Sequence, residues 1–292
     1  MTFRTRFAPS PTGPLHLGHA YSAILAHDMA AAEEGEFLLR IEDIDHSRSR
    51  PEWEELIYED LHWLGLSWPE PVMRQSERQA AYEAALDRLW ERDLLYVCTC
   101  RRRDIEAAAS APQEGAPLLG PDGIVYPGTC RKSLRAASGP RPRDAVLRLD
   151  MAAALKALSA NGGGKIEFCE TGSSPNGASG LTQISHVHLT MLVGDVVLAR
   201  RQMGTSYHLS VVLDDAEQGI THAVRGQDLF ETTAIHVVLQ RLLDLPTPIY
   251  HHHRLIRDEN GRRLAKRDDA RAIRKYRKDG VTPDDIRAMV GL

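Results

Sequence analysis

The stretch RFAPSPTGPLHLGH, residues 6–19, joins a short apolar segment to an alanine-rich one through a loop that three prolines stiffen. Residues 3–8 read as a strand, and residues 18–32 are apolar at helical spacing, which predicts a helix. Strands and helices then alternate along the chain, which predicts an α/β fold with a parallel sheet and helices on both faces. Ligands of such sheets bind beyond the carboxyl ends of the strands, so this first turn is a candidate site.

Two histidines mark the start of the predicted helix. His16 and His19 are three residues apart, so they share one face at the helix start. A helix N-terminus presents unpaired N–H groups and suits phosphate, and Gly18 lets a ligand approach the backbone. The imidazoles could donate to phosphate oxygens as charge builds during displacement at phosphorus. The alternative is a pair of histidines that only cap the helix.

The remaining pattern outlines further elements and two loops. It predicts strands at 36–41, 146–149, 189–198 and 222–224, and helices at 53–64, 78–93, 211–217, 232–243 and 283–290. Residues 110–128 and 159–180 are rich in glycine, proline or serine and read as loops or insertions. A chain of 292 residues predicts two domains, or one core with a large insertion.

Charge and composition limit the class of protein. The chain has 40 acidic and 36 basic residues, net −4, which excludes a uniformly basic nucleic-acid surface. Residues 98–148 carry 9 basic against 5 acidic groups and residues 251–280 carry 11 against 5. These two stretches either border a polyphosphate or nucleic-acid site or are solvated faces. No apolar run approaches a membrane span, and four cysteines favour a reducing cytoplasm.

Four motifs in order give the chain a resemblance to a known family. Residues 6–19 resemble the signature of class I glutamyl-tRNA synthetases, and LRIEDID at 39–45, VRGQDL at 224–229 and RLAKR at 263–267 follow in the family's order. The resemblance implies a Rossmann nucleotide-binding fold with an inserted zinc-containing subdomain and a short C-terminal helical segment. It divides the chain into residues 1–97 and 166–250 as the two catalytic halves, 98–165 as the insertion, and 251–292 as the lysine-loop segment.

Amino-acid activation joins a carboxylate to the α-phosphate of ATP, and the residues can be assigned to that chemistry. Planar guanidinium groups bind a side-chain carboxylate best, which favours Arg6 and Arg225, while Glu42 and Tyr207 could hold the substrate ammonium. The alternative for each is a structural ion pair or a packed tyrosine. The resemblance assigns the glutamate pocket to six residues: Arg6, Ala8, Ser10, Glu42, Tyr207 and Arg225. It assigns ATP binding and catalysis to four: His16, Gly18, His19 and Lys266.

The lysine-bearing motif departs from the family in two places. Lys266 is the residue expected to stabilise pyrophosphate as it leaves, with Mg²⁺ accompanying ATP. Arg263 stands where the family usually has lysine and keeps the charge. Ala265 stands where the family usually has serine, and the lost hydroxyl predicts weaker closure of this loop.

Three cysteines raise the question of a metal site. Cys98 and Cys100 are separated by one residue and Cys130 follows 30 residues later; this spacing alone favours unlinked reduced thiols. The segment YPGTC at 126–130 resembles an element of short glutamyl-synthetase paralogues that bind zinc. The resemblance implies one structural Zn²⁺ held by Cys98, Cys100, Tyr126 and Cys130. The segment between Cys100 and Tyr126 is longer than the family leads us to expect.

The end of the chain separates two related activities. After Lys266 there is room for one helix and not for an anticodon-binding domain, so the expected match is with the glutamyl-queuosine tRNA(Asp) synthetases. That family activates L-glutamate with ATP and transfers it to queuosine in the anticodon of tRNA(Asp), and we expect a cytoplasmic monomer. Three alternatives stay open: a truncated or discriminating glutamyl-tRNA synthetase, a non-catalytic RNA-binding paralogue, and another nucleotidyl transferase.

Overall fold

The computed structural model describes residues 2–109, 118–160, 164–175, 177–257 and 271–292. The strands are β1 (Arg4–Phe7), β2 (Glu36–Ile41), β3 (Met73–Arg74), β4 (Leu95–Cys98), β5 (Leu119–Gly120), β6 (Gly123–Ile124), β7 (Val146–Leu149), β8 (Ile166–Glu170), β9 (Gly180–Ile184), β10 (Val197–Ala199), β11 (His222–Gly226) and β12 (Ile249–His253). The α-helices are α1 (Leu17–Ala32), α2 (Pro51–Trp63), α3 (Gln79–Glu91), α4 (Arg102–Ala109), α5 (Met151–Ala160), α6 (His186–His188), α7 (Tyr207–Glu217), α8 (Thr233–Leu242), α9 (Ile273–Lys278) and α10 (Pro283–Val290).

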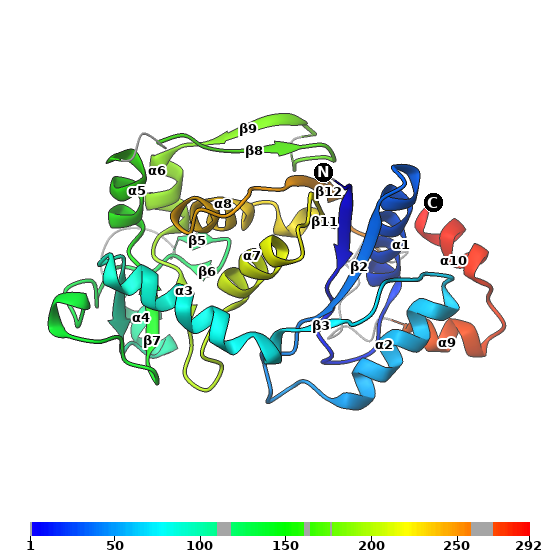
Figure 1. Cartoon of the computed structure of the whole chain (residues 1–292), viewed down its shortest axis with the longest axis horizontal. Helices are drawn as coiled ribbons and strands as arrows, with labels where there is room; N and C mark the ends of the chain where they lie inside the picture. Colours follow the sequence, from blue (N-terminus) through cyan, green and yellow to red (C-terminus); the bar gives the residue numbers. More distant parts are fainter. Residues whose placement is uncertain (1, 110–117, 161–163, 176, 258–270) are drawn as a thin grey trace.

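Parallel strands run through the centre of the molecule (Figure 1). β1 pairs in parallel with β2, β2 with β3, β11 with β12 and β12 with β8. The backbone N–H of Thr221, beside β11, donates to the carbonyl oxygen of Arg4 over 3.1 Å, which places β11 next to β1. The predicted parallel pairing is therefore confirmed for these strands, whereas β9 pairs antiparallel with β8 at the edge of the sheet. The ends of β1 and β11 meet at one edge.

A second, antiparallel sheet lies apart from the parallel strands. β7 pairs with both β4 and β10, so the strand at Val197–Ala199 belongs to the same sheet as the segment around residues 95–149. The short strands β5 and β6 form a hairpin. Figure 1 shows these elements on one side of the molecule and β1–β3 with α1, α2, α9 and α10 on the other, with α7 and β11 between them.

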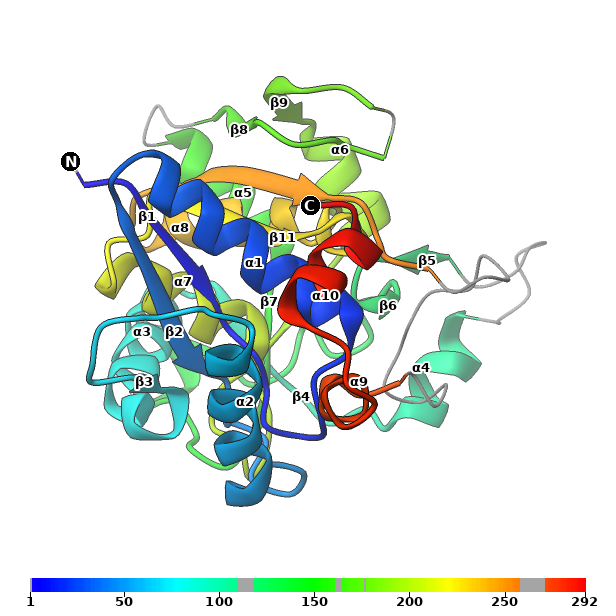
Figure 2. The same cartoon turned by 90° about the vertical axis from the view of Figure 1, so that its right-hand side faces the viewer.

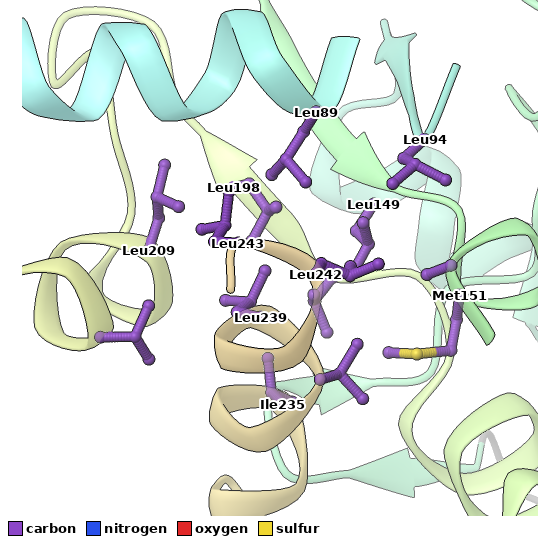
Figure 3. Close-up of a cluster of buried hydrophobic side chains, with 14 of the residues drawn as sticks. Leu89, Leu94, Leu149, Met151, Leu198, Leu209, Ile235, Leu239, Leu242 and Leu243 are labelled. Atoms are coloured by element: carbon purple, nitrogen blue, oxygen red, sulfur yellow. The ribbon is translucent and has the colours of Figure 1, made fainter. Parts of the chain in front are cut away.

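Two apolar cores support these sheets. The larger one packs α3, α5, α7 and α8 around β4, β7 and β10, and Figure 3 shows leucines such as Leu89, Leu149 and Leu239 meeting there. The smaller one lies between β1, β2, α1 and α2 and takes in Ile273 of α9 and Ile286 of α10. Figure 2 shows α10 against α1, so the carboxyl-terminal helix completes the core of the amino-terminal half.

The structure corrects two of the predictions and confirms others. Residues 189–198 are not one strand, because a helical turn covers Leu189–Val193 and only Val197–Ala199 is extended. Gly194 follows that turn at a φ of 70°, a value that breaks regular structure in either form. Residues 159–180 are not only a loop, since β8 lies within them. The helix predicted at 283–290 is confirmed, and no helix in the described part of the chain is long and apolar enough to cross a membrane.

Candidate functional site

The histidine pair lies at the start of α1, as the sequence predicts. His16 is the N-cap residue, and its Nδ1 accepts the backbone N–H of Gly18 over 3.1 Å. Nδ1 of His19 accepts the backbone N–H of His16 over 3.2 Å. Because Nδ1 is the acceptor in both rings, the neutral rings carry their hydrogen on Nε2. The pair therefore caps the helix at the end that carries its positive partial charge, as one of the two readings of the sequence predicts.

The first ring lies close to Gly18. A Cβ added at this position would lie 3.1 Å from Cε1 and 3.2 Å from Nδ1 of His16. A side chain here would therefore require the imidazole that caps α1 to shift by a few tenths of an ångström.

A cavity of about 620 Å³ lies beside α1 and the end of β1. Five of the predicted site residues line it: Ala8, Ser10, His19, Glu42 and Tyr207. The backbone N–H of Glu42 donates to the carbonyl oxygen of Pro9 over 3.0 Å, which ties the proline-stiffened loop to the end of β2. Two turns that are distant in sequence thus form one wall, at the edge where a parallel sheet binds its ligands.

Arg6 belongs to a buried network of opposite charges. Its Nε and Nη2 donate to the two oxygens of Asp215 over 3.0 and 3.2 Å. Arg40 donates to Asp215 over 2.7 Å and to Glu42 over 3.2 Å. Burial raises the pKa of Asp215, but the two guanidinium groups outweigh it and the pKa lies below its usual value. Burial raises the pKa of Glu42 despite Arg40 and Arg6. A further cation beside it, such as an ammonium, would therefore stabilise the ionised carboxylate.

Arg225 is also buried but has different partners. Its Nε donates to His252 over 3.1 Å and its Nη1 to His236 over 3.0 Å, and Nη2 donates to the hydroxyl of Thr233. The guanidinium carbon lies 4.9 Å from the centre of the Tyr250 ring. These partners are uncharged when the histidines are neutral. Among the described residues, the positive charge of Arg225 therefore has no direct carboxylate partner.

The structure brings half of the ten residues predicted for glutamate and ATP together in one cavity wall and adds others. Arg6, Arg225, His16 and Gly18 are not part of the cavity wall in the described chain, although Arg6 reaches Glu42 of that wall through Asp215 and Arg40. Sequence reasoning missed Arg40, Asp215 and His208, of which His208 lines the cavity. The adjacent acids at 214–215, directly after the apolar run at 211–213, are the signal that could have revealed Asp215.

The lysine-bearing motif, with Arg263, Ala265 and Lys266, lies outside the described residues. Both flanks of that segment are described. β12 runs parallel to β11, and its last residue, His253, pairs with Gly226. On the other side Ala272 forms a bridge with His16, and the N–H of Ile273 donates to the carbonyl oxygen of Leu15 over 2.9 Å.

The three cysteines and Tyr126 form a candidate metal centre. The Sγ atoms of Cys98, Cys100 and Cys130 all lie within 4.8 Å of one another, and that of Cys100 is 3.5 Å from that of Cys130. The phenol oxygen of Tyr126 lies 3.5 Å from Sγ of Cys98 and 3.4 Å from Sγ of Cys100. Ligands of a tetrahedral Zn²⁺ would be about 3.8 Å apart for two sulfurs and about 3.5 Å apart for sulfur and oxygen. The donor set therefore fits a four-coordinate zinc ion.

Neighbouring groups hold this donor set in place. The backbone N–H of Cys130 donates to the phenol oxygen of Tyr126 over 2.9 Å. The guanidinium of Arg148 lies 3.9 Å from the centre of the Tyr126 ring, and its Nε is 3.4 Å from Sγ of Cys98. Tyr126 is 3% exposed, so the phenol is fixed among the thiols.

Known proteins resemble this chain over nearly all of its length. It is 61% identical over 294 residues to a glutamyl-Q tRNA(Asp) synthetase of Rhodobacter capsulatus, with 99% of each chain covered. A glutamyl-Q tRNA(Asp) synthetase of Nocardia farcinica is 39% identical, with 98% of this chain and 82% of that protein covered. The crystal structure of a glutamate tRNA ligase from Elizabethkingia meningosepticum, in complex with its amino acid, matches with a TM-score of 0.73 at 26% identity.

That ligase is longer than the present chain, which covers 61% of it while being itself fully covered. A family model described as the catalytic domain of class I tRNA synthetases (E and Q) matches residues 2–292. With parallel strands, a histidine pair at the start of α1 and the cavity beside it, the chain belongs to the family of class I tRNA synthetases (E and Q), catalytic domain.

Proposed function

We propose that this protein activates L-glutamate with ATP and transfers it to the queuosine base in the anticodon of tRNA(Asp). The observation that carries the proposal is the 61% identity, over 99% of both chains, to a protein named glutamyl-Q tRNA(Asp) synthetase. The cavity supports it, because Glu42 and Tyr207 line the wall and two buried arginines stand near it. A pocket of this kind fits an amino acid that carries two carboxylates and one ammonium.

The residues take distinct parts in this proposed reaction. Nε2–H of His16 and His19 would donate to phosphate oxygens of ATP at the positive end of α1. Glu42 and Tyr207 would bind the ammonium, Ala8 and Ser10 would form the floor of the pocket, and the arginines would attract the carboxylates. Lys266 would bind the departing pyrophosphate, which carries Mg²⁺. The flanks of its segment, at His253 and Ala272, support this part, since Ala272 pairs with His16.

Isotope exchange between ATP and pyrophosphate tests the first half-reaction. We expect exchange that depends on glutamate and needs no tRNA. Substitution Lys266→Ala should lower it by about two orders of magnitude or more, as the loss of a transition-state charge contact does. Lys156→Ala, on the exposed side of α5, serves as the control and should exchange normally. Exchange with aspartate or glutamine in place of glutamate would refute the proposal.

The acceptor decides between two related activities. Labelled glutamate should appear on tRNA(Asp) that carries queuosine and not on tRNA(Asp) that lacks it. Label on the terminal ribose of tRNA(Glu) would instead assign the activity of a glutamyl-tRNA synthetase, as the likeness to the glutamate tRNA ligases suggests. The basic stretches at 98–148 and 251–280 would contact tRNA phosphates, so binding should weaken as salt rises.

The cysteine cluster supports a structural zinc ion in the proposed insertion. Cys98, Cys100, Tyr126 and Cys130 would hold it, and the metal would fold the segment that follows β4. Metal analysis of the purified protein should find about one zinc per chain. The variant Cys100→Ser should bind less, while Cys169→Ser, an exposed thiol outside the cluster, should match the unaltered protein. Zinc absent from unaltered protein and both variants would reject the site.

A further inference from the structure

The partners of Arg225 fix the hydrogen positions on two buried rings. A guanidinium donates hydrogen bonds and accepts none, so Nε2 of His252 and Nδ1 of His236 must be the acceptors. His252 therefore carries its hydrogen on Nδ1, where it meets the carboxylate of Glu170. His236 carries its hydrogen on Nε2. Both rings are almost fully buried.

The chain of contacts continues from His236 to the cavity. Nε2 of His236 lies 3.2 Å from Nδ1 of His208, so His236 donates and His208 accepts. His208 is therefore left with its hydrogen on Nε2. That atom lies 3.5 Å from a carboxylate oxygen of Asp122, at the turn of the β5–β6 hairpin. Both His208 and Asp122 line the 620 Å³ cavity.

Burial keeps the middle of this chain uncharged. Desolvation, followed by the charge of Arg225, lowers the pKa of His236 well below its usual value. His236 is thus neutral near pH 7 and has one hydrogen to donate. A neutral ring whose Nδ1 faces a cation cannot change to the other tautomer without setting two donors against each other. The direction of the hydrogen bonds from Arg225 to the cavity is therefore determined.

We propose that His208 is a further substrate-binding residue, whose Nε2–H donates to a carboxylate of the amino acid, and that His236, which accepts a hydrogen bond from Arg225, is a positioning residue that fixes this donor. The inference rests on the proposed function, because it takes an acidic amino acid as the ligand. Asp122 then marks the position of the ligand carboxylate, since one of its carboxylate oxygens lies 3.5 Å from Nε2 of His208 in this structure. When the substrate binds, its carboxylate takes this position and accepts the N–H.

Two substitutions at one position test the donor. We expect His208→Leu to raise the KM for glutamate by about tenfold to a hundredfold, the usual loss for a hydrogen bond to a charged group. The KM for ATP should stay within about twofold. His208→Gln places an N–H near the position of Nε2 and should keep the glutamate KM within about threefold. His222→Gln, on β11 but stacked on Phe3, is the matched control.

Two further variants test the positioning and the stand-in carboxylate. His236→Leu removes the acceptor of Arg225 and the donor to His208, so the glutamate KM should rise about tenfold. Asp122→Ala removes the competing carboxylate, so the glutamate KM should fall by about threefold. A purely structural role for these residues would change stability and both KM values together, and it would not produce effects of opposite sign.

The outcomes separate this inference from the proposed function. Absence of glutamate-dependent exchange by the unaltered protein overturns the proposed function and this inference with it. If exchange is present, equal effects of His208→Leu and His208→Gln would overturn the inference alone. A higher glutamate KM for Asp122→Ala would also overturn it, because Asp122 would then bind the substrate ammonium. Calorimetric titration with glutamate checks each variant without relying on turnover.

Discussion

Arg6 and Arg225 lie on neighbouring strands, are equally buried, and have opposite electrostatic surroundings. Each is 5% exposed. Arg6 shares the carboxylate of Asp215 with Arg40, so opposite charges alternate within one buried network. Arg225 donates to two imidazoles and a hydroxyl, and a carboxylate, that of Glu170, is reached only through His252. The two arginines therefore have different hydrogen-bond acceptors, a carboxylate for Arg6 and neutral groups for Arg225.

The difference indicates which arginine attracts an anion. A buried charge that already has a carboxylate partner contributes little field beyond that pair. A buried charge surrounded by neutral acceptors is stabilised by their dipoles but is not neutralised, so its electrostatic field still attracts an oppositely charged ligand. We infer that Arg225 contributes more than Arg6 to the positive potential that favours an acidic substrate, while Arg6 also maintains the structure of the sheet edge.

The largest effect is expected from a substitution that breaks the buried charge network around Arg6. Asp215→Asn would leave Arg6 and Arg40 as buried cations without this partner, so the free energy of unfolding should fall by about 3–5 kcal/mol. Urea unfolding at pH 7 measures the change. Glu217→Gln on the same helix is the control, because its side chain is 59% exposed and such pairs contribute roughly 0–1 kcal/mol. Equal losses in the two variants would show that Asp215 does not hold the network together.

A smaller effect distinguishes the two arginines in binding. Arg225→Gln should raise the KM for glutamate about a hundredfold, which corresponds to about 2.7 kcal/mol. Arg6→Gln should raise it less than about tenfold and should instead lower the stability, since Asp215 loses one of its two cations. Pyrophosphate exchange at varied glutamate gives the KM values and urea unfolding gives the stabilities. The reverse order of KM values would assign the anion-attracting part to Arg6.

The sequence predicts the frame of the molecule well because the frame has local signals. Alternating strands and helices give the parallel sheet, and the Thr-Pro start of residues 282–283 precedes a helix as predicted. The histidine pair is also local, and its place at the start of α1 follows from the glycine and the apolar spacing around it. The prediction for 189–198 is wrong because Gly194 and Asp195 divide the segment, and a short apolar stretch such as 189–193 suits a helical turn as well as a strand.

The networks behind the cavity have no comparable signal. Arg6 and Asp215 are 209 residues apart in the chain, and His252 links Arg225 to Glu170 only because β12 pairs with both β11 and β8. Residue types alone leave open whether a buried arginine faces a carboxylate or an imidazole. The roles of the predicted site residues therefore stay predictions until the variants are measured, although five of them share one cavity wall.

The smallest expected effect is a difference in how the free energy of unfolding depends on pH at the two arginine sites. Burial and the charge of Arg225 lower the pKa of His236, so below about pH 6.5 the unfolded chain binds a proton that the folded chain does not. Stability should therefore fall as pH decreases through that range, by up to about 1.4 kcal/mol per pH unit for this one group. The pKa of Asp215 is lowered as well, but its stabilisation is lost only below about pH 4.

Urea unfolding at pH 7.5, 6.5 and 5.5 separates the two sites. His236→Asn keeps an acceptor near the position of Nδ1 and cannot titrate, so its stability should depend less on pH between 6.5 and 5.5 than that of the unaltered protein. Asp215→Asn should be less stable by the same amount at all three values. The other buried histidines are present in both proteins, so the difference isolates His236. Parallel pH curves for His236→Asn and the unaltered protein would mean that burial and Arg225 do not hold this ring neutral, and the contrast between the two arginine sites would then lose its electrostatic basis.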